Sequence, residues 1–547
     1  MVVPIDNHFD FIVVEGGTGG NTVAGRLAEN ANVKVLIIEA GPGHNKDIPE
    51  IQTPARAFEL RGSQYDWAYK TTMIDREDYT RVETPNTRGK VLGGSSALNY
   101  YTWIRGSKAT FDDWEEYGGS SWTWDQCKEY FDKPANYHDD SHLYNPDLAK
   151  HGRNGPLDVA VSDMVPELEP FRKALSSAWV SKGGILNDEI YNGEMHGLAR
   201  CMNTIYKGVR STSALFLKGK PNITILGHTH AKQILIEDGA ATGVVVITAE
   251  ADELTIRAKK DIIVSSGVYE TPKLLMLSGI GSVEELAPHG IDVKVESQHV
   301  GKNLLDHPIM PHVFRLKDGL GLEDHLLRAG PQHDGAISAY RKNKSGPYSS
   351  GLLELVGLPR IDEYLATSKD DAFQWHIPTP PAGSWLTVIV DLLRPLSRNG
   401  YVKLNSTNPL EQPIINLNFF SNDLDLVALR EGCRYVDDIL MNGDGMKDII
   451  GEDYPWPMPR NSDEAMNKMI LERSQTGFHP CRTARLGKSI EQGVVDHELR
   501  VFGVKNLRIT DASVFPVIPD CRIQNAVYMV AERGADFIKA AHPDLYQ

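Results

Sequence analysis

The sequence predicts an α/β protein, and three features near its start support that prediction. Residues 11–14 form a short apolar run, residues 15–20 are rich in glycine, and residues 21–29 have the apolar spacing of a helix. A second apolar run follows at residues 34–38. A strand, a turn, a helix and a strand in this order form a β-α-β unit, which is typical of α/β proteins.

The glycine-rich turn predicts that this unit binds a dinucleotide. Gly17 and Gly20 occupy two of the three positions where such a turn needs glycine, and Glu15 occupies the first. A turn without side chains lets a pyrophosphate approach the backbone, and the positive end of the following helix faces the phosphate charge. The second strand ends at Glu39, about 20 residues beyond the glycines, where an acid binds the ribose hydroxyl groups. We therefore expect a Rossmann-like domain in which Gly17, Gly20 and Glu39 bind the cofactor.

Further apolar runs predict a small sheet after the first unit, and then a second domain on the substrate side. The runs assigned to the small sheet are residues 223–226, 233–236, 243–247 and 261–264. From about residue 308 to residue 473 the chain mixes strands and helices with many prolines between them. Its predicted elements are strands at residues 386–390 and 401–404 and a helix at residues 425–441.

The composition narrows the classes of partner. The chain has 547 residues and a formal charge of −16, from 57 Lys and Arg against 73 Asp and Glu. This excess of acid argues against nucleic acid or an acidic membrane surface as a partner. Five cysteines lack the spacing of a zinc site or a disulfide framework, and no stretch reaches ~18 apolar residues. We expect a cytoplasmic protein without a metal site, and its oligomeric state stays open.

The stretch from Arg88 to Gly106, RGKVLGGSSALNYYTWIRG, resembles the first signature of the glucose-methanol-choline (GMC) flavin oxidoreductases. Its side-chain-poor segment can lie against a cofactor, and Asn99 can bond a polar ring edge. The resemblance implies that the cofactor is FAD, bound here by Gly93, Gly94, Ser95 and Asn99. Family members that attach FAD covalently use a histidine in this segment, whereas this chain has Ala97 and Leu98. We therefore expect non-covalent FAD.

Three later stretches resemble the same family. Residues 267–281 are similar to its second signature, and residues 300–307 contain its Val-Gly-x-Asn-Leu-x-Asp-His string, which ends at His307. Residues 494–513 resemble the segment that returns to the cofactor domain, and there the resemblance places Asp511 near the ribityl and phosphate side of the flavin. His307 and Asp511 could equally serve as a hydrogen-bonding residue and a helix cap, respectively.

The resemblance implies an α+β fold of two domains. The FAD-binding domain is Rossmann-like and discontinuous, and the substrate domain is built on an antiparallel sheet flanked by helices. We expect residues 1–158, 204–310 and 476–547 to form the first domain, and residues 159–203 and 311–475 to form the second.

The expected catalytic pair is His479 and Arg522. His479 lies in Gly-Phe-His-Pro, where the resemblance implies that it faces flavin N5 across the substrate, and a neutral imidazole suits a general base. The position that pairs with it falls on Arg522, where most relatives have His or Asn. A permanently cationic fork of donors matches a carboxylate, so we expect a small anionic substrate that loses hydride at carbon.

Formate meets both demands, and the chain resembles the formate-oxidising members of the family. The expected reaction is the oxidation of formate by dioxygen to carbon dioxide and hydrogen peroxide. The expected cofactor is FAD or its 8-formyl derivative.

Two alternatives stay open. The first is a GMC alcohol oxidase or dehydrogenase for a small polar alcohol, in which Arg522 serves another purpose, such as an ion pair with Asp520. The second is a cofactor-poor, non-catalytic relative, suggested by Glu15 in the glycine turn and by Arg482 after the His-Pro pair, where a glycine is common. An ion pair between Glu15 and Arg482 would neutralise both of these unusual charges near the cofactor.

Overall fold

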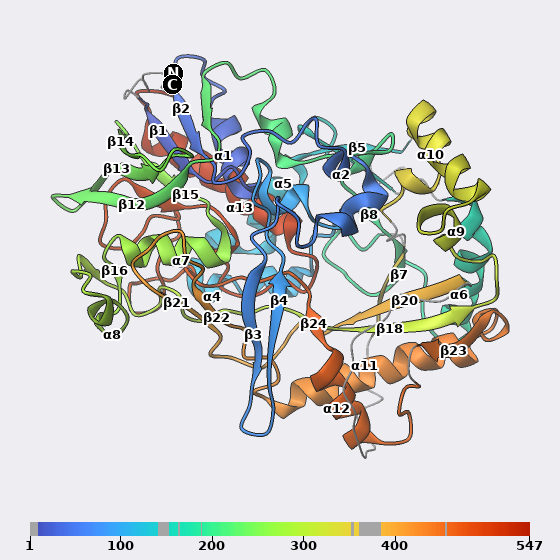
Figure 1. The fold of residues 1–547 in the computed structure, drawn as a ribbon. Coiled ribbons are helices and arrows are strands. Elements are labelled where there is room, and N and C mark those ends of the chain that lie inside the picture. The colour runs from blue at the N-terminus through green and yellow to red at the C-terminus, as the bar shows by residue number, and fades with distance from the viewer. Residues whose placement is uncertain are drawn as a thin grey trace.

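A five-stranded parallel sheet organises the first part of the molecule (Figure 1). The computed structural model describes residues 9–139, 152–161, 165–187, 189–351, 355–359, 384–454 and 457–546. The strands of the sheet, in spatial order, are β11 (Ile223–Leu226), β2 (Val35–Ile38), β1 (Phe11–Val14), β15 (Ile262–Val264) and β25 (Leu507–Ile509). Segments from the start, middle and end of the chain therefore lie side by side in one sheet.

Both faces of this sheet are covered, which explains why its strands read as continuous apolar runs. Phe11 and Val13 of β1 face helices α1 (Thr18–Leu27) and α13 (Gln524–Ala541) in one buried cluster. Ile12 and Val14 face the opposite side and join the main core of the molecule. Because alternate side chains enter two different cores, every residue of β1 is buried.

The predicted small sheet is only half right. The runs at residues 223–226 and 261–264 belong to the parallel sheet, as β11 and β15. The other two lie in β12 (His230–Glu237) and β13 (Ala240–Ile247), which form a separate antiparallel sheet with β14 (Glu253–Arg257). The burial patterns differ accordingly: β15 is fully buried, whereas β13 mostly alternates between buried and half-buried residues.

The second part is built on an antiparallel sheet flanked by helices, as the sequence predicted. Strand β18 (Pro308–Leu316) lies between β20 (Ser384–Asp391) and β23 (Ile450–Tyr454). Helix α11 (Asp423–Asn442) packs against this sheet, and α6 (Glu169–Ser181) packs against α11 (Figure 1). The α/β class with two structural parts is therefore confirmed.

Continuous strands join these two parts. Strand β18 pairs with β24 (Gln475–Thr476), which leads directly into the segment of His479. The expected domain boundaries at residues 310/311 and 475/476 therefore fall inside paired strands rather than in linkers.

The remaining elements frame the two parts. A four-stranded sheet follows the order β21 (Tyr401–Lys403), β22 (Ile414–Asn416), β3 (Tyr69–Asp75) and β4 (Thr80–Asn86). Smaller sheets pair β5 (Ala135–His138) with β6 (Leu157–Val161) and β8 (Met202–Asn203), β7 (Gly197–Arg200) with β19 (Leu355–Leu358), β9 (Ile205–Tyr206) with β10 (Val209–Arg210), and β16 (Ile280–Gly281) with β17 (Val295–Glu296). The other helices are α2 (Pro49–Gln52), α3 (Lys108–Asp112), α4 (Glu115–Gly118), α5 (Trp124–Asp132), α7 (Gly267–Leu277), α8 (Val283–Leu286), α9 (Glu323–Leu326), α10 (Pro331–Asn343) and α12 (Asp463–Arg473).

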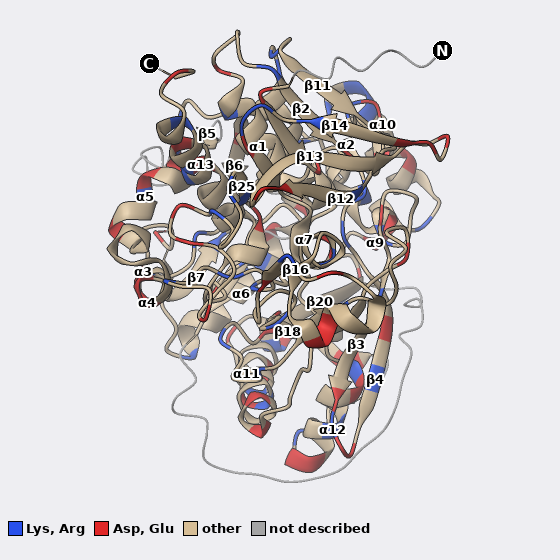
Figure 2. Cartoon of the chain, turned by 90° about the vertical axis from the view of Figure 1, so that its left-hand side faces the viewer, with Lys and Arg blue, Asp and Glu red and all other residues tan. Residues whose placement is uncertain are grey.

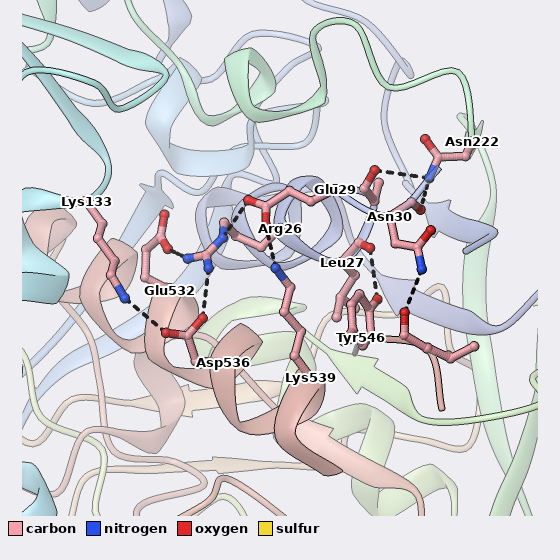
Figure 3. A network of polar contacts seen from close by, with 12 residues as sticks. Arg26, Leu27, Glu29, Asn30, Lys133, Asn222, Glu532, Asp536, Lys539 and Tyr546 are labelled. Atoms are coloured by element: carbon pink, nitrogen blue, oxygen red, sulfur yellow. Dashed lines mark hydrogen bonds and ion pairs between the residues drawn. The ribbon is translucent and has the colours of Figure 1, made fainter. Parts of the chain in front are cut away.

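Ion pairs fasten the last helix, α13, to the first, α1 (Figure 3). Arg26 of α1 bonds Glu532 and contacts Asp536 at 2.8 Å, and Lys133 contacts the other oxygen of Asp536 at 3.0 Å. One turn further along, Lys539 reaches Glu29. This network, defined here as the α1–α13 clamp, closes the face of the parallel sheet on which both helices lie.

Acidic and basic residues are interspersed along both parts of the molecule (Figure 2). Among the described residues, no helix combines the length and the apolar character that crossing a bilayer requires.

Candidate active site

The carboxyl ends of the parallel strands bring the expected cofactor residues to one edge. Gly17 and Gly20 follow β1, Glu39 follows β2, and Asp511 follows β25. In open α/β sheets this edge is where ligands bind. The order of the strands therefore gathers residues from both ends of the chain around one place.

The two glycines of the turn do different things. A Cβ added to Gly20 would lie 2.1 Å from the carbonyl oxygen of Glu15, so Gly20 lets α1 pack against the turn. A Cβ added to Gly17 would meet nothing nearer than 3.7 Å. A side chain at Gly17 would thus make only ordinary contacts, and Gly267 at the start of α7 presents bare backbone to open space, because nothing lies within 4 Å.

The second glycine segment lies directly on the first. The amide of Gly93 donates to the carbonyl of Gly16 at 2.7 Å, and a Cβ on Gly94 would be 2.7 Å from the Cα of Gly17. Ser95 follows, and its hydroxyl accepts from the amide of Gly89 at 3.3 Å. Two motifs far apart in the sequence therefore form one side-chain-free surface.

Glu39 and Glu15 both bond to backbone amides at this edge. Glu39 accepts from Gly16 at 3.1 Å and from Gly41 at 2.8 Å, and burial raises its pKa to about 7. Glu15 accepts from the amide of Ala40 at 3.2 Å, and burial together with the charge of Glu39 raises its pKa well above the usual value. This shift favours the neutral form of Glu15, and a neutral carboxyl repels a pyrophosphate less than a carboxylate does.

Asn99 and Asp511 bond to the protein itself. Asn99 donates to Gln524 at 2.8 Å, at the start of α13, and its oxygen accepts from Arg210 at 3.0 Å. Asp511 accepts from Thr271 at 2.7 Å and from the amide of Gly267 at 3.0 Å. Asn99 thus ties the second glycine segment to α13, and Asp511 ties β25 to α7.

Arg522 precedes α13 and is paired with a carboxylate from the substrate-side sheet. Its Nη1 lies 2.9 Å from Oδ2 of Asp391, at the end of β20. Asp520, its neighbour in the sequence, instead accepts from the amide and the hydroxyl of Ser107, at 2.8 and 2.6 Å. The ion pair between Arg522 and Asp520 that the sequence left open is therefore not formed.

His479 lies near Arg522 and next to His307. Burial, then the charge of Arg522, lower the pKa of His479 well below its usual value. Its Nδ1 is 3.0 Å from Nδ1 of His307, whose own pKa burial lowers to about 3. Both imidazoles are neutral near pH 7, and one of the two Nδ1 atoms carries the hydrogen that they share.

Asp306 holds the loop that carries the two histidines. It accepts from the amide of His307 at 2.7 Å, from the amide of His479 at 2.8 Å and from the hydroxyl of Thr476. The expected site residues omitted Asp306 and Asp391. Asp306 could have been found, because it stands beside His307 in the recognised string. Asp391 has no such signal, since only the three-dimensional fold brings β20 to Arg522.

The suggested ion pair between Glu15 and Arg482 is absent among the described residues. Glu15 bonds to Ala40 at the end of β2, whereas Arg482 lines a pocket with Arg394 and Arg398. The two side chains therefore lie in different surroundings, although each residue has a positive φ, 71° at Glu15 and 81° at Arg482.

Comparisons with known proteins identify the family of this chain. Residues 9–309 match the profile of the N-terminal part of GMC oxidoreductases, and residues 395–531 match that of the C-terminal part. A crystal structure of formate oxidase is 55% identical, covers 98% of this chain and 99% of its own, and superposes with a TM-score of 0.96. The oxygen-dependent choline dehydrogenase of Pseudomonas putida is 31% identical over 98% of this chain and 95% of its own length. Pyridoxine 4-oxidase from Mesorbium loti is 25% identical, with a TM-score of 0.81, covering 96% of this chain and 98% of its own.

The fold and these matches define a flavin-dependent oxidoreductase. The chain belongs to the GMC oxidoreductase family, whose cofactor is FAD. The residues present fit that group, because Gly17 and Gly267 leave bare backbone where a dinucleotide must approach. The alternative of a cofactor-poor, non-catalytic relative is therefore set aside.

Proposed function

We propose that this protein is a formate oxidase. One formate, one dioxygen and one proton would give one carbon dioxide and one hydrogen peroxide. The observation that carries the proposal is a guanidinium, Arg522, beside a neutral imidazole, His479, at the edge where the cofactor residues gather. The solved formate oxidase at 55% identity supports the same activity.

Arg522 binds the carboxylate in this proposal. Asp391 takes Nη1 of the guanidinium at 2.9 Å, which leaves other N–H groups for a second carboxylate. A small anion can pair with that fork and keep its C–H bond free, whereas a neutral alcohol would leave the fork without an anionic partner. Bound FAD supplies the hydride acceptor and passes the electrons to dioxygen.

His479 acts as a neutral acceptor rather than as a second cation. Nε2 of His307 is buried without a hydrogen-bond partner in the described part of the structure, so the polar partner of its ring is Nδ1 of His479. In this proposal His479 donates the shared hydrogen from Nδ1, and Nδ1 of His307 accepts it. Nε2 of His479 then keeps its lone pair and can take the proton of formic acid or orient the substrate.

The cofactor roles belong to the same proposal. The residues that would hold non-covalent FAD are Gly17, Gly20, Glu39, Gly93, Gly94, Ser95, Asn99 and Asp511. We assign residues 1–158, 204–310 and 476–547 to the FAD-binding domain, and residues 159–203 and 311–475 to the substrate domain. In this division Asp391 and Arg522 come from different domains, so the substrate site lies between the two. The five cysteines are free and buried, which supports a cytoplasmic, reducing location.

The test measures hydrogen peroxide released by the purified holoenzyme with formate, methanol or choline as the reductant. Formate should give peroxide and the two alcohols should give little. Arg522→Ala should reduce kcat/KM for formate at least ~100-fold, because the carboxylate loses a charged bidentate partner. Unchanged turnover of formate by this variant would refute the role of Arg522.

The second candidate is a small-alcohol oxidase or dehydrogenase, favoured by the relatives named oxygen-dependent choline dehydrogenase. It predicts that methanol or choline is the better reductant and that Arg522→Ala spares that activity. The same assay therefore separates the two candidates.

The state of the flavin needs its own measurement. Two solved structures of a formate oxidase from Aspergillus oryzae concern the effect of replacing an arginine on FAD modification. We propose that the flavin here is FAD or 8-formyl-FAD, and that Arg522→Lys alters the ratio of the two. Mass spectrometry of the released cofactor measures that ratio directly.

A further inference from the structure

A pocket of about 330 Å³ lies behind the loop that carries His479. Leu305 lines it and exchanges two backbone hydrogen bonds with Cys481, so one wall belongs to the loops of both histidines. Its charged and polar lining residues are Arg394, Arg398, Arg482, Asp113, Glu116 and Tyr117. Arg482 is only 7% exposed, whereas Arg394 and Arg398 are exposed at the rim.

The guanidinium of Arg482 lacks a counter-ion within the described part of the chain. Its Nε is buried without a hydrogen-bond partner. The charges that act on it most strongly include two other cations, Arg485 and Arg398, and burial lowers its pKa to about 10. An unpaired buried cation is unfavourable unless an anion or water solvates it.

The backbone makes this arginine still more unusual. Arg482 has a φ of 81°, in the left-handed region that favours glycine. A glycine at this position would remove both the strain and the buried charge. The protein has a cationic side chain here although both the backbone strain and the buried charge are unfavourable.

The acidic residues of the pocket do not neutralise it. Asp113 is already bound by Arg394 at 2.9 Å, and Arg394 also donates to the hydroxyl of Thr110. Glu116, exposed at the rim, is the one carboxylate of the lining that could compete for Arg482. The lining therefore carries three guanidinium groups against two carboxylates.

We propose that this pocket is a binding site for a small oxyanion, with Arg482 as its floor and Arg398 at its rim. A planar fork of N–H groups pairs with two oxygens of a carboxylate, phosphate or sulfate, and the volume leaves room for bridging water. The lining does not include Arg522, and the occupant would brace the two segments that Leu305 and Cys481 join by backbone hydrogen bonds. This inference does not rest on the proposed function.

Isothermal titration of the holoenzyme with inorganic phosphate, at constant ionic strength, tests the site. The wild type should bind phosphate at a saturable site, and Arg482→Gly should lose at least tenfold in affinity. This variant is expected to fold, because glycine relaxes the positive φ. Arg398→Gln should weaken binding several-fold, and Glu116→Gln should strengthen it. Arg257→Gln, on the exposed strand β14 and paired only with local partners, is the matched control and should bind as the wild type does.

Phosphate could also reach Arg522, so every titration is repeated in Arg522→Met. Binding that survives in Arg522→Met and is lost in Arg482→Gly supports the proposal. Binding that is lost in Arg522→Met and kept in Arg482→Gly overturns it, and so does the absence of binding in both the wild type and Arg522→Met. Binding confined to Glu116→Gln also overturns it, because the protein's own carboxylate would then fill the pocket.

Formate added to the phosphate complex of Arg522→Met identifies the source of the natural anion. Displacement of phosphate supports the site and indicates a small carboxylate. Retention of phosphate supports the site and indicates an inorganic oxyanion.

Discussion

A single carboxylate, Asp391, holds the guanidinium on which the proposed substrate site depends. It is half-buried, and one of its oxygens, Oδ1, is buried without a hydrogen-bond partner in the described part of the structure. Burial raises its pKa, and the charge of Arg522 opposes that shift. Asp391 therefore acts as a positioning residue. It binds Nη1 of the Arg522 guanidinium and leaves the other N–H groups free to bind the substrate.

Asp391→Ala should raise KM for formate about 10- to 100-fold, with a smaller change in kcat. A charge-assisted hydrogen bond contributes about 1.5–3 kcal/mol, and its loss lets the guanidinium turn away from the substrate. Steady-state kinetics of peroxide release measure the change. Asp520→Asn is the matched control, because Asp520 is next to Arg522 in the sequence but bonds to Ser107. Equal effects of the two substitutions would contradict the positioning role.

The pH profile should report the neutral state of His479. Because its pKa lies well below 6.5, kcat/KM for formate should stay flat as pH falls through the usual range of histidine. Activity should fall only at lower pH, where the imidazole becomes protonated. Arg522 lowers this pKa, so Arg522→Met should move the acid limb of its residual activity upward. A limb near pH 6.5 in the wild type would exclude a buried neutral imidazole.

In the turn between β1 and α1, one glycine is needed for packing and another is expected to bind the cofactor. A Cβ on Gly20 would meet the carbonyl of Glu15, whereas a Cβ on Gly17 would make only ordinary contacts, and the φ of −78° at Gly17 is one that alanine tolerates. The sequence could predict that glycine is needed here, because the β-α-β unit and its turn are local. It could not assign a different task to each glycine, since that depends on contacts across the turn.

Gly17→Ala should give a folded protein with little flavin, and Gly20→Ala should give a destabilised one. A methyl group at residue 17 would occupy the approach of the pyrophosphate, whereas at residue 20 it would collide with backbone. The ratio of flavin to protein absorbance, together with the melting temperature of the apoprotein, distinguishes the two effects. A low apoprotein melting temperature for Gly17→Ala would refute the separation.

The α1–α13 clamp should stabilise the fold in a way that depends on pH. Arg26→Met should lower the free energy of unfolding by about 1–3 kcal/mol, because it leaves Glu532 buried without its cation. Folding lowers the pKa of Asp536. The stability that this residue contributes is therefore fully present above its pKa in the unfolded chain, and it is lost as the pH falls through its pKa in the folded protein. Thermal unfolding at pH 7 and at about pH 2 measures both effects, because the loss falls below the usual aspartate pKa of 3.8. Lys128→Met, from an exposed pair with Asp125, should change stability by less than about 0.5 kcal/mol.

At the scale of the whole molecule, the sequence predicted the elements that depend on neighbouring residues. It did not predict the contacts between segments that lie far apart in the sequence. Strands β1 and β11 have the predicted bounds, because short apolar runs flanked by turns mark buried strands. The resemblance placed residues 479 and 522 in one site, and the structure brings them close enough to interact. The sheet partners of residues 223–226 and 261–264 were missed, and so was Asp391. In each case the deciding contact joins residues more than a hundred positions apart, which periodicity does not encode.

The parallel sheet takes β1 from the beginning of the chain and β25 from near its end, and the ring of Phe11 lies 5.4 Å from that of His542. During translation the first strands therefore emerge long before the neighbours that complete their pairing and before the helix that covers them. Until β25 and α13 have been synthesised, an apolar face of this nascent domain stays exposed, and bringing in its partners means closing a very long loop. Completion of the domain is thus expected to wait for these two elements, and chaperones are expected to protect the exposed face from aggregation until then.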